Sequence, residues 1–170
     1  MSKGNGIDRY MGIGVALAIG AFGNAYLDLG SRWQRGAGGE RRVGRQLERL
    51  AKRGWTISHD LPKSSGGNID HVTLGPGGAM FTIETKLNRF GGRELGQARS
   101  HAGYLERALD HPVTPVLCVA NGKSKPKLYA GVWCVGSTRL VAFLDQQTTG
   151  RRAVDPELVT RLSQRCELSG

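Results

Sequence analysis

Residues 68–86 read Asn-Ile-Asp-His-Val-Thr-Leu-Gly-Pro-Gly-Gly-Ala-Met-Phe-Thr-Ile-Glu-Thr-Lys, and the prediction of the fold begins here. The two arms, residues 68–74 and 79–86, are rich in Ile, Val, Thr and Phe and flank the glycine turn at residues 75–78. Such runs around a glycine turn predict a β-hairpin. With the turn centred on Gly77, we expect Val72 to pair with Thr82 and Leu74 with Met80.

The same register brings three charged side chains together. Asp70 lies opposite Glu84, and Lys86 follows on the same face because strand side chains alternate. Like charges that face each other destabilise a ladder by roughly 0.2–1 kcal/mol, so the two carboxylates favour a cation between them. The hairpin therefore predicts a metal site with an ammonium beside it.

Composition favours a polyanionic partner. The 170 residues include 24 Lys and Arg against 14 Asp and Glu, which gives a net charge of +10 and a pI near 10.1. This charge favours nucleic acid, with anionic lipid or a merely soluble basic surface as the alternatives. The cysteines at 118, 134 and 166 have no CxxC spacing and the four histidines are scattered, so no zinc ligand set is indicated.

Residues 10–27 carry no charged side chain and reach the lower length limit for a membrane helix, although glycines at 12, 14, 20 and 23 weaken it. Three interpretations stay open: a membrane anchor, an apolar arm packed on the domain or on a partner, and a cleaved signal peptide. Arginines at 32, 35, 41 and 42 follow the segment. By the positive-inside rule we expect a cytoplasmic protein, with a tether to the inner face of the membrane under the first interpretation.

A helix is expected directly after the glycine-rich residues 36–39. Val43, Leu47, Leu50 and Ala51 recur at helical spacing and predict a core-facing stripe on a helix that runs to about residue 53. Glu40 falls on the same stripe, so its carboxylate is directed toward the core side, although a first-turn acid that stabilises the helix dipole explains it equally well.

The remaining pattern predicts a mixed α/β fold. A second amphipathic helix covers residues 95–109, with Gln97 in its first turn, where it either faces the metal site or is solvated. The apolar run at residues 114–120 is typical of a strand covered on both faces. The other expected elements are strands at residues 55–58 and 129–135, loops at 59–67 and 121–127, and helices at 137–144 and 156–166.

Several of these segments together resemble the nuclease-related domain (NERD) family, placed within the PD-(D/E)XK nuclease superfamily. The resemblance rests on Gly39-Glu40-Arg41-Arg42, Asn68-Ile69-Asp70-His71-Val72, Gly75-Pro76-Gly77-Gly78, Ile83-Glu84-Thr85-Lys86, Gln97-Ala98-Arg99 and Gly131-Val132-Trp133-Cys134-Val135-Gly136. It spans residues 36 to about 145. An Asp fourteen residues before an ExK triplet, across a glycine hairpin and after a helical Gly-Glu, is specific as a combination.

The resemblance implies a restriction-endonuclease-like core, a mixed sheet flanked by helices, and metal-dependent cleavage of phosphodiester bonds. By this similarity Asp70 and Glu84 are metal ligands, Lys86 lies near the attacking water, Glu40 is an additional acid and Gln97 is a supporting polar group. Mg²⁺ is the expected ion, with Mn²⁺ as a substitute, because two carboxylates and water suit its octahedral oxygen coordination. DNA is expected as substrate before RNA.

The sequence thus divides into an apolar segment at residues 1–35, a nuclease-like domain at 36–145 and a helical tail at 146–170. Basic side chains in or after the expected site are candidates for contact with the phosphate backbone: Arg89, Arg93, Arg99, Lys123, Lys125 and Lys127. The alternative function is a catalytically silent nuclease-like module that binds nucleic acid or a protein, with or without a membrane tether. The oligomeric state is not indicated.

Overall fold

The computed structural model describes residues 37–64, 66–88, 90–148 and 155–167. Residues 37–51 are helical, and strands β1 (Thr56–Pro62), β2 (Asn68–Leu74) and β3 (Met80–Lys86) follow. Then come α2 (Gly92–Leu109), β4 (Val113–Val119), β5 (Lys127–Tyr129), β6 (Val132–Gly136), α3 (Ser137–Thr148) and α4 (Pro156–Glu167).

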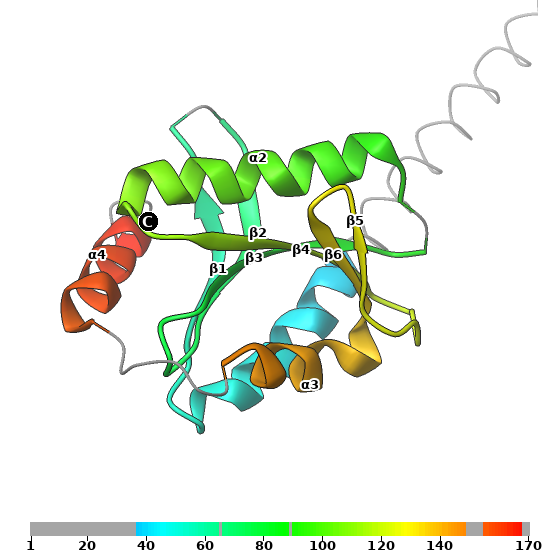
Figure 1. Ribbon diagram of the computed structural model, residues 1–170, viewed down its shortest axis with the longest axis horizontal. Coiled ribbons are helices and arrows are strands. Elements are labelled where there is room, and N and C mark those ends of the chain that lie inside the picture. The colour runs from blue at the N-terminus through cyan, green and yellow to red at the C-terminus, as the bar shows by residue number, and fades with distance from the viewer. Residues whose placement is uncertain (1–36, 65, 89, 149–154, 168–170) are drawn as a thin grey trace, which may run out of the picture. The chain divides into compact units, whose positions relative to one another are not determined.

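The six strands form one mixed sheet in the order β1-β2-β3-β4-β6-β5. β1, β2 and β3 are antiparallel neighbours, β4 runs parallel to both β3 and β6, and β5 is antiparallel to β6. Helix α2 supplies the crossover between the parallel strands β3 and β4 (Figure 1). The α/β class and the mixed sheet flanked by helices that the sequence predicts are confirmed.

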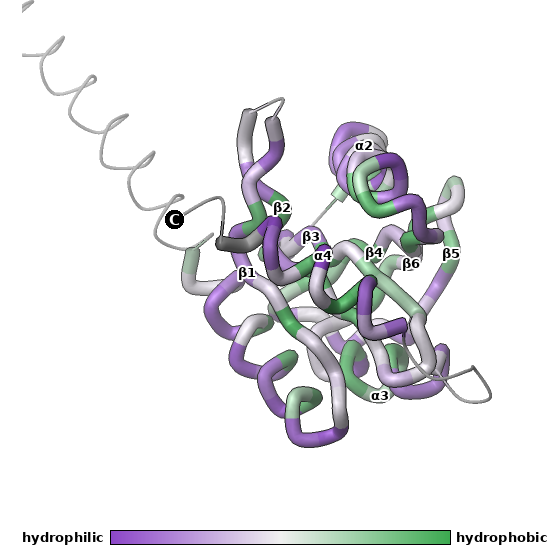
Figure 2. Tube along the Cα trace, turned by 90° about the vertical axis from the view of Figure 1, so that its left-hand side faces the viewer, coloured by the Kyte–Doolittle hydropathy of each residue, from purple (hydrophilic) through white to green (hydrophobic). Residues whose placement is uncertain are grey.

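Helices cover both faces of the sheet (Figure 1). On one face, Leu47 of the first helix and Leu140 of α3 pack with Phe81 and Val116. On the other, α2 and α4 contact β2 and β3 through a cluster that includes Leu105. Figure 2 shows much of the hydrophilic colour on the helices, as expected where only one stripe of each helix is buried.

The first helix matches its prediction except at one position. Val43, Leu47 and Leu50 are fully buried, whereas Ala51 is exposed because the chain leaves the helix there and turns at Gly54. The strand predicted over residues 114–120 is β4, and its side chains enter clusters on both faces, as the unbroken apolar run indicated.

A predicted loop and a predicted strand differ in the structure. β1 continues to Pro62, into the loop expected at residues 59–67, and proline is tolerated there because β1 is an edge strand. The strand expected at residues 129–135 is instead a hairpin, in which β5 and β6 meet at Ala130 and Gly131. Both of these residues have positive φ (47° and 79°), which is typical of a tight hairpin turn.

The predicted C-terminal helix is α4, and the carboxylate of Asp155 caps it by accepting a hydrogen bond from the Glu157 N–H (2.9 Å). Its Leu158 and Leu162 are buried against the α2 side of the sheet.

The three-part division of the chain stays a prediction. So do the interpretations of residues 10–27 and the cytoplasmic location, since that segment lies outside the described residues. No helix within the described part has the length and apolar character needed to cross a membrane.

Candidate metal and nuclease site

The β2–β3 hairpin has the register that the sequence predicts. Its turn closes through a hydrogen bond from the Gly78 N–H to the Gly75 carbonyl (2.8 Å), and Gly78 has a φ of 78°. Glycine adopts this left-handed conformation without the strain that a Cβ would cause. The paired residues are Leu74 with Met80, Thr73 with Phe81, Val72 with Thr82 and His71 with Ile83.

Asp70 directly precedes His71, the β2 residue at which this ladder ends, and its side chain contacts the backbone of β3. Its Oδ2 accepts a hydrogen bond from the Thr85 backbone N–H (2.7 Å). β3 meanwhile continues along β4, pairing Glu84 with Leu117 and Lys86 with Val119. The carboxylate of Asp70 is therefore fixed beside the Glu84–Lys86 end of β3.

Glu84 is only 3 % exposed and has a partner at each carboxylate oxygen. Lys86 Nζ donates to Oε1 (2.6 Å), and His101 Nδ1 lies 3.1 Å from Oε2. Burial acts to raise the pKa of Glu84, but hydrogen bonds from His101 and Lys86 outweigh it and hold the pKa below its usual value. Glu84 is therefore ionised at neutral pH.

The pKa of Asp70 moves the opposite way. Burial, followed by the negative charge of Glu84, raises it from 3.8 to about 7, although the hydrogen bond from Thr85 acts to lower it. Two neighbouring carboxyl groups whose environments push their pKa values apart are typical of functional sites. Without a cation, Asp70 retains a proton to near neutral pH, and a bound cation would take the place of that proton.

Asp70 and Glu84 fit a Mg²⁺ ion by donor chemistry. Both are hard oxygen donors, and Asp70 is half-buried beside the negative charge of Glu84, an environment that a bound cation would stabilise. Mg²⁺ is usually held by one or two carboxylates together with water and substrate phosphate rather than by a full protein cage. Among the residues described, no group of three or more His, Cys, Asp or Glu side chains is placed to hold a metal ion.

Glu40 approaches this site from the first helix, as its position on the core-facing stripe predicts. It is half-buried, and burial raises its pKa, with further contributions from the charges of Asp60 and Glu84 and an opposing one from Lys86. Asp60 was not predicted. In β1, His59 pairs with His71 and Leu61 with Ile69, so Asp60 lies level with Asp70, in a left-handed conformation (φ 52°).

His101 is the other site residue that the sequence analysis missed. It lies on α2 and is only 2 % exposed, although histidine is not a residue that an apolar helix stripe would include. Gln97 is half-buried one helical turn earlier on the same face, toward the start of α2. The available sequence signal was that His101 lies four positions after Gln97 and so shares its side of the helix. The sequence could not show that His101 is buried, because its burial depends on how α2 packs on β3.

A second group of polar side chains links β2 to the first helix. Nδ1 of His71 lies 2.8 Å from Nδ1 of His59, and Nε2 of His59 lies 2.7 Å from Oε1 of Glu48. Burial, followed by the neighbouring His59, lowers the pKa of His71 to about 4, so His71 is neutral. A Cβ on Gly44 would lie 3.5 Å from both imidazoles, so this part of the helix is closely packed on them. These contacts help to fix the helix that carries Glu40.

The basic residues predicted to contact nucleic acid occupy separate places. Arg99 Nη1 donates to the Ala130 carbonyl (2.8 Å), and Lys127 Nζ lies 4.9 Å from the centre of the Tyr129 ring, so both contact the β5–β6 hairpin. Arg93 is exposed in the first turn of α2, and Lys123 and Lys125 are exposed after β4. Arg89 lies outside the described residues. Their binding role stays a prediction.

The mixed sheet and the acidic hairpin site with its lysine define a nuclease-related α/β protein. Residues 35–120 match the family described as nuclease-related domain (NERD). The chain belongs to this family, and the prediction made from its motifs is confirmed.

One solved structure similar to this chain is the crystal structure of a repair endonuclease from Pyrococcus abyssi, with 15 % sequence identity and a TM-score of 0.37. The match covers 58 % of this chain and 38 % of that chain, so it spans less than half of the length of the repair endonuclease. No curated protein matches the sequence.

The contact between His101 and Glu84 gives a prediction for stability. Oε2 of Glu84 is buried and has no other hydrogen-bond partner among the described residues, so His101→Leu leaves it beside an apolar side chain. We expect a loss of about 1–3 kcal/mol of folding free energy, the usual cost of leaving a buried acceptor without its hydrogen-bond partner. Urea denaturation at pH 7 measures this change in the free energy of unfolding. His101→Gln, which retains an N–H donor, should lose less, and Ser100→Ala on the exposed side of α2 is the control. A Leu variant as stable as the wild type would contradict the assigned contact.

Proposed function

We propose that this protein is a Mg²⁺-dependent nuclease that hydrolyses phosphodiester bonds, most readily in DNA, with Mn²⁺ as a substitute ion. The observation that carries the proposal is the arrangement of three side chains at the end of β3: the Asp70 carboxylate accepts from the Thr85 N–H (2.7 Å), and Lys86 Nζ lies 2.6 Å from the carboxylate of the buried Glu84. The opposite displacement of the pKa values of Asp70 and Glu84 agrees with this arrangement. Membership of the nuclease-related family supports the reaction class. Asp70 and Glu84 are the proposed metal ligands.

The residues of the site have separable roles in this proposal. When bound, Mg²⁺ supplies Lewis-acid stabilisation of phosphoryl charge and helps to generate hydroxide from water. Lys86 is held 2.6 Å from Glu84, where its ammonium can position the attacking water or stabilise the charge that develops on the phosphate. Its partner is an ionised carboxylate, so we favour this electrostatic role over that of a general base.

Glu40 and Gln97 are proposed as supporting residues. Glu40 adds negative charge on the first-helix side, where it can hold a water molecule or a second cation. Gln97, at the start of α2, can donate to a phosphate or to water. Hydrolysis then adds one water across a P–O bond, leaving a phosphate on one strand end and a hydroxyl on the other.

DNA is a possible substrate in the proposal because the chemistry needs no group that DNA lacks, and the assay below compares it with RNA. Carboxylates, a divalent cation and an ammonium activate external water, whereas a 2′-hydroxyl is what allows a protein to distinguish RNA. The net charge of +10 supports binding to either polyanion, with an affinity that falls as salt is raised.

The test is to incubate the full chain with single-stranded, double-stranded and circular DNA and with RNA, in the presence of Mg²⁺, Mn²⁺ or EDTA. We expect cleavage of DNA with either ion, loss of cleavage in EDTA, and recovery when Mg²⁺ is restored. An Asp70→Asn preparation purified in parallel controls for contaminating nucleases. Binding of nucleic acid without cleavage under any condition would reject the proposal and support the silent binding module instead.

A further inference from the structure

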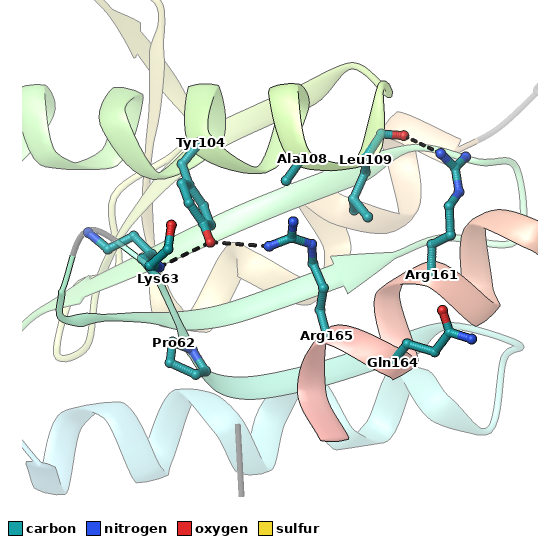
Figure 3. A pocket seen from close by; sticks show the side chains of 9 residues that line it. Pro62, Lys63, Tyr104, Ala108, Leu109, Arg161, Gln164 and Arg165 are labelled. Atoms are coloured by element: carbon teal, nitrogen blue, oxygen red, sulfur yellow. Dashed lines mark hydrogen bonds between the residues drawn. The ribbon is translucent and has the colours of Figure 1, made fainter. Parts of the chain in front are cut away.

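An open pocket of about 580 Å³ lies between the loop after β1, helix α2 and helix α4 (Figure 3). Three of its lining residues are cationic, Lys63, Arg161 and Arg165, and its lining contains no Asp or Glu. A concave surface that carries one sign of charge concentrates ligands of the opposite sign. The pocket is therefore suited to an anion, and none of its cations belongs to the set predicted from the sequence.

The two arginines are held in place by the protein. They lie one turn apart on α4, and Figure 3 shows both side chains extending toward α2. Arg161 Nη1 donates to the Leu109 carbonyl at the end of α2 (2.7 Å), and Arg165 Nη1 donates to the Tyr104 hydroxyl (3.1 Å). Because these bonds already restrict the side chains, less conformational entropy is lost when a ligand binds.

Tyr104 also ties the opposite wall of the pocket to α2. Its hydroxyl accepts a hydrogen bond from the Ser64 N–H (3.2 Å) as well as from Arg165. The loop that carries Lys63 is thereby joined to the helix that faces α4. Guanidinium groups match the geometry of phosphate oxygens and bind them with paired hydrogen bonds. Phosphate is therefore the anion that best fits the α4 side of the pocket, which carries the two arginines.

The pocket borders the carboxylate site along two elements. On α2, Tyr104 follows His101, the partner of Glu84, by three residues, which is roughly 4.5 Å of helix. On β2, Asn68 pairs with Pro62 at the pocket wall and precedes Asp70 by two residues, roughly 7 Å of strand. One extended polyanion can therefore contact both places.

We propose that this pocket binds a backbone phosphate of the same nucleic-acid strand that is cut at the carboxylate site, a few nucleotides from the scissile bond. The proposal rests on the proposed function for the identity of the strand. It adds a substrate requirement, because only a strand long enough to reach from Asp70 to the pocket gains this contact. Short oligonucleotides should therefore be cut with a higher KM than long ones, at a similar kcat.

The experiment compares two double variants that each remove two positive charges. Lys63→Gln with Arg161→Gln alters the pocket, and Arg49→Gln with Lys52→Gln alters exposed positions at the end of the first helix, which packs on the opposite face of the sheet. Binding of a labelled single strand of about 20 nucleotides is measured in EDTA over a series of salt concentrations. We expect roughly tenfold weaker binding and a salt slope smaller by about 1 for the pocket variant alone. Equal losses in the two variants would overturn the proposal, because net charge alone would explain them.

A third variant guards against a folding defect. Gln164 is an exposed lining residue, and Gln164→Glu introduces a negative charge without removing a cation. It should weaken binding of the long strand and raise its KM while kcat stays unchanged. Wild-type binding by this variant would count against the pocket as a phosphate site.

Two further arms separate the remaining outcomes. Inorganic phosphate is titrated against the wild type and the pocket variants. If the pocket variants lose phosphate binding but bind the strand normally, the pocket serves a small free anion and the proposal is wrong.

Cleavage is assayed beside Asp70→Asn. If the wild type cleaves DNA but the pocket variants do not weaken binding, only the pocket proposal fails. If nothing is cleaved yet the pocket variants bind less strand, the proposed function fails and the pocket contact stands.

Discussion

Asp70→Asn is expected to lower DNA cleavage by about a thousandfold or more and, in the same protein, to stabilise the metal-free fold above neutral pH. Asparagine retains a side-chain oxygen that can accept the hydrogen bond from the Thr85 N–H, so the junction between β2 and β3 persists. It lacks the negative charge that a divalent cation requires. Three factors of ten correspond to about 4 kcal/mol of transition-state stabilisation, which lies within the range of metal-ion catalysis.

The stabilisation follows from the raised pKa of Asp70. The folded protein holds this proton up to about pH 7, whereas the unfolded chain releases it near 3.8, so between these values the folded state binds more protons. Stability from this group is therefore complete below pH 3.8 and is lost as the pH rises through 7. Each unit of displacement is worth about 1.4 kcal/mol, so the loss amounts to a few kcal/mol.

His71 contributes a slope of the opposite sign. Its pKa is lowered to about 4 from 6.5, so the folded state binds fewer protons and stability rises with pH between these values. The raw stability profile of the wild type therefore mixes both effects. The difference in free energy of unfolding between wild type and Asp70→Asn isolates Asp70, and we expect it to shift in favour of the variant from pH 4 to pH 8 without metal.

Chemical denaturation across this pH range, with and without Mg²⁺, measures the effect. Mg²⁺ should stabilise the wild type at pH 8 and leave Asp70→Asn unchanged, because ligand binding stabilises only a protein that has the site. Glu157→Gln removes one carboxylate from the exposed first turn of α4 and serves as the control, with normal cleavage. Cleavage by Asp70→Asn within tenfold of the wild type would refute its role as a metal ligand.

Gly136→Ala is expected to destabilise the fold more than other single glycine substitutions in the described sheet and helices. A Cβ at this position would lie 2.5 Å from the Gly122 carbonyl oxygen and 2.7 Å from the Ser124 nitrogen. These are backbone atoms, which cannot rotate away, and the Gly136 N–H itself donates to the Ser124 carbonyl (3.1 Å). We expect a cost of at least about 3 kcal/mol, at the upper end of overpacking effects.

Urea denaturation of wild type, Gly136→Ala and Gly96→Ala tests this prediction. Gly96 lies inside α2, and a Cβ there meets no atom within 4 Å, so alanine should stabilise the helix by about 0.5–1 kcal/mol. Gly136 pairs with Val119, which in turn pairs with Lys86, so cleavage should fall as well. A Gly136→Ala protein of wild-type stability would mean that the loop after β4 moves aside.

Local patterns were sufficient for much of the fold. The hairpin register followed from glycine turn chemistry and alternating side chains, and the helix stripes followed from their spacing. The same patterns failed at β1, where Pro62 and the glycines at 66 and 67 indicated a loop from residue 59, and at the β5–β6 turn. Both lie in edge hairpins, where positive φ or proline is compatible with strand pairing.

The sequence by itself determined the hairpin that carries Asp70, Glu84 and Lys86, because turn residues and a two-residue period act over short distances. Only the tertiary structure decided which groups surround it: His101 from α2, Asp60 from β1 and the cationic pocket beside α4. Desolvation and charge proximity depend on which distant segments pack together. For that reason the opposite pKa displacements of Asp70 and Glu84 at the proposed site belong to the folded protein alone.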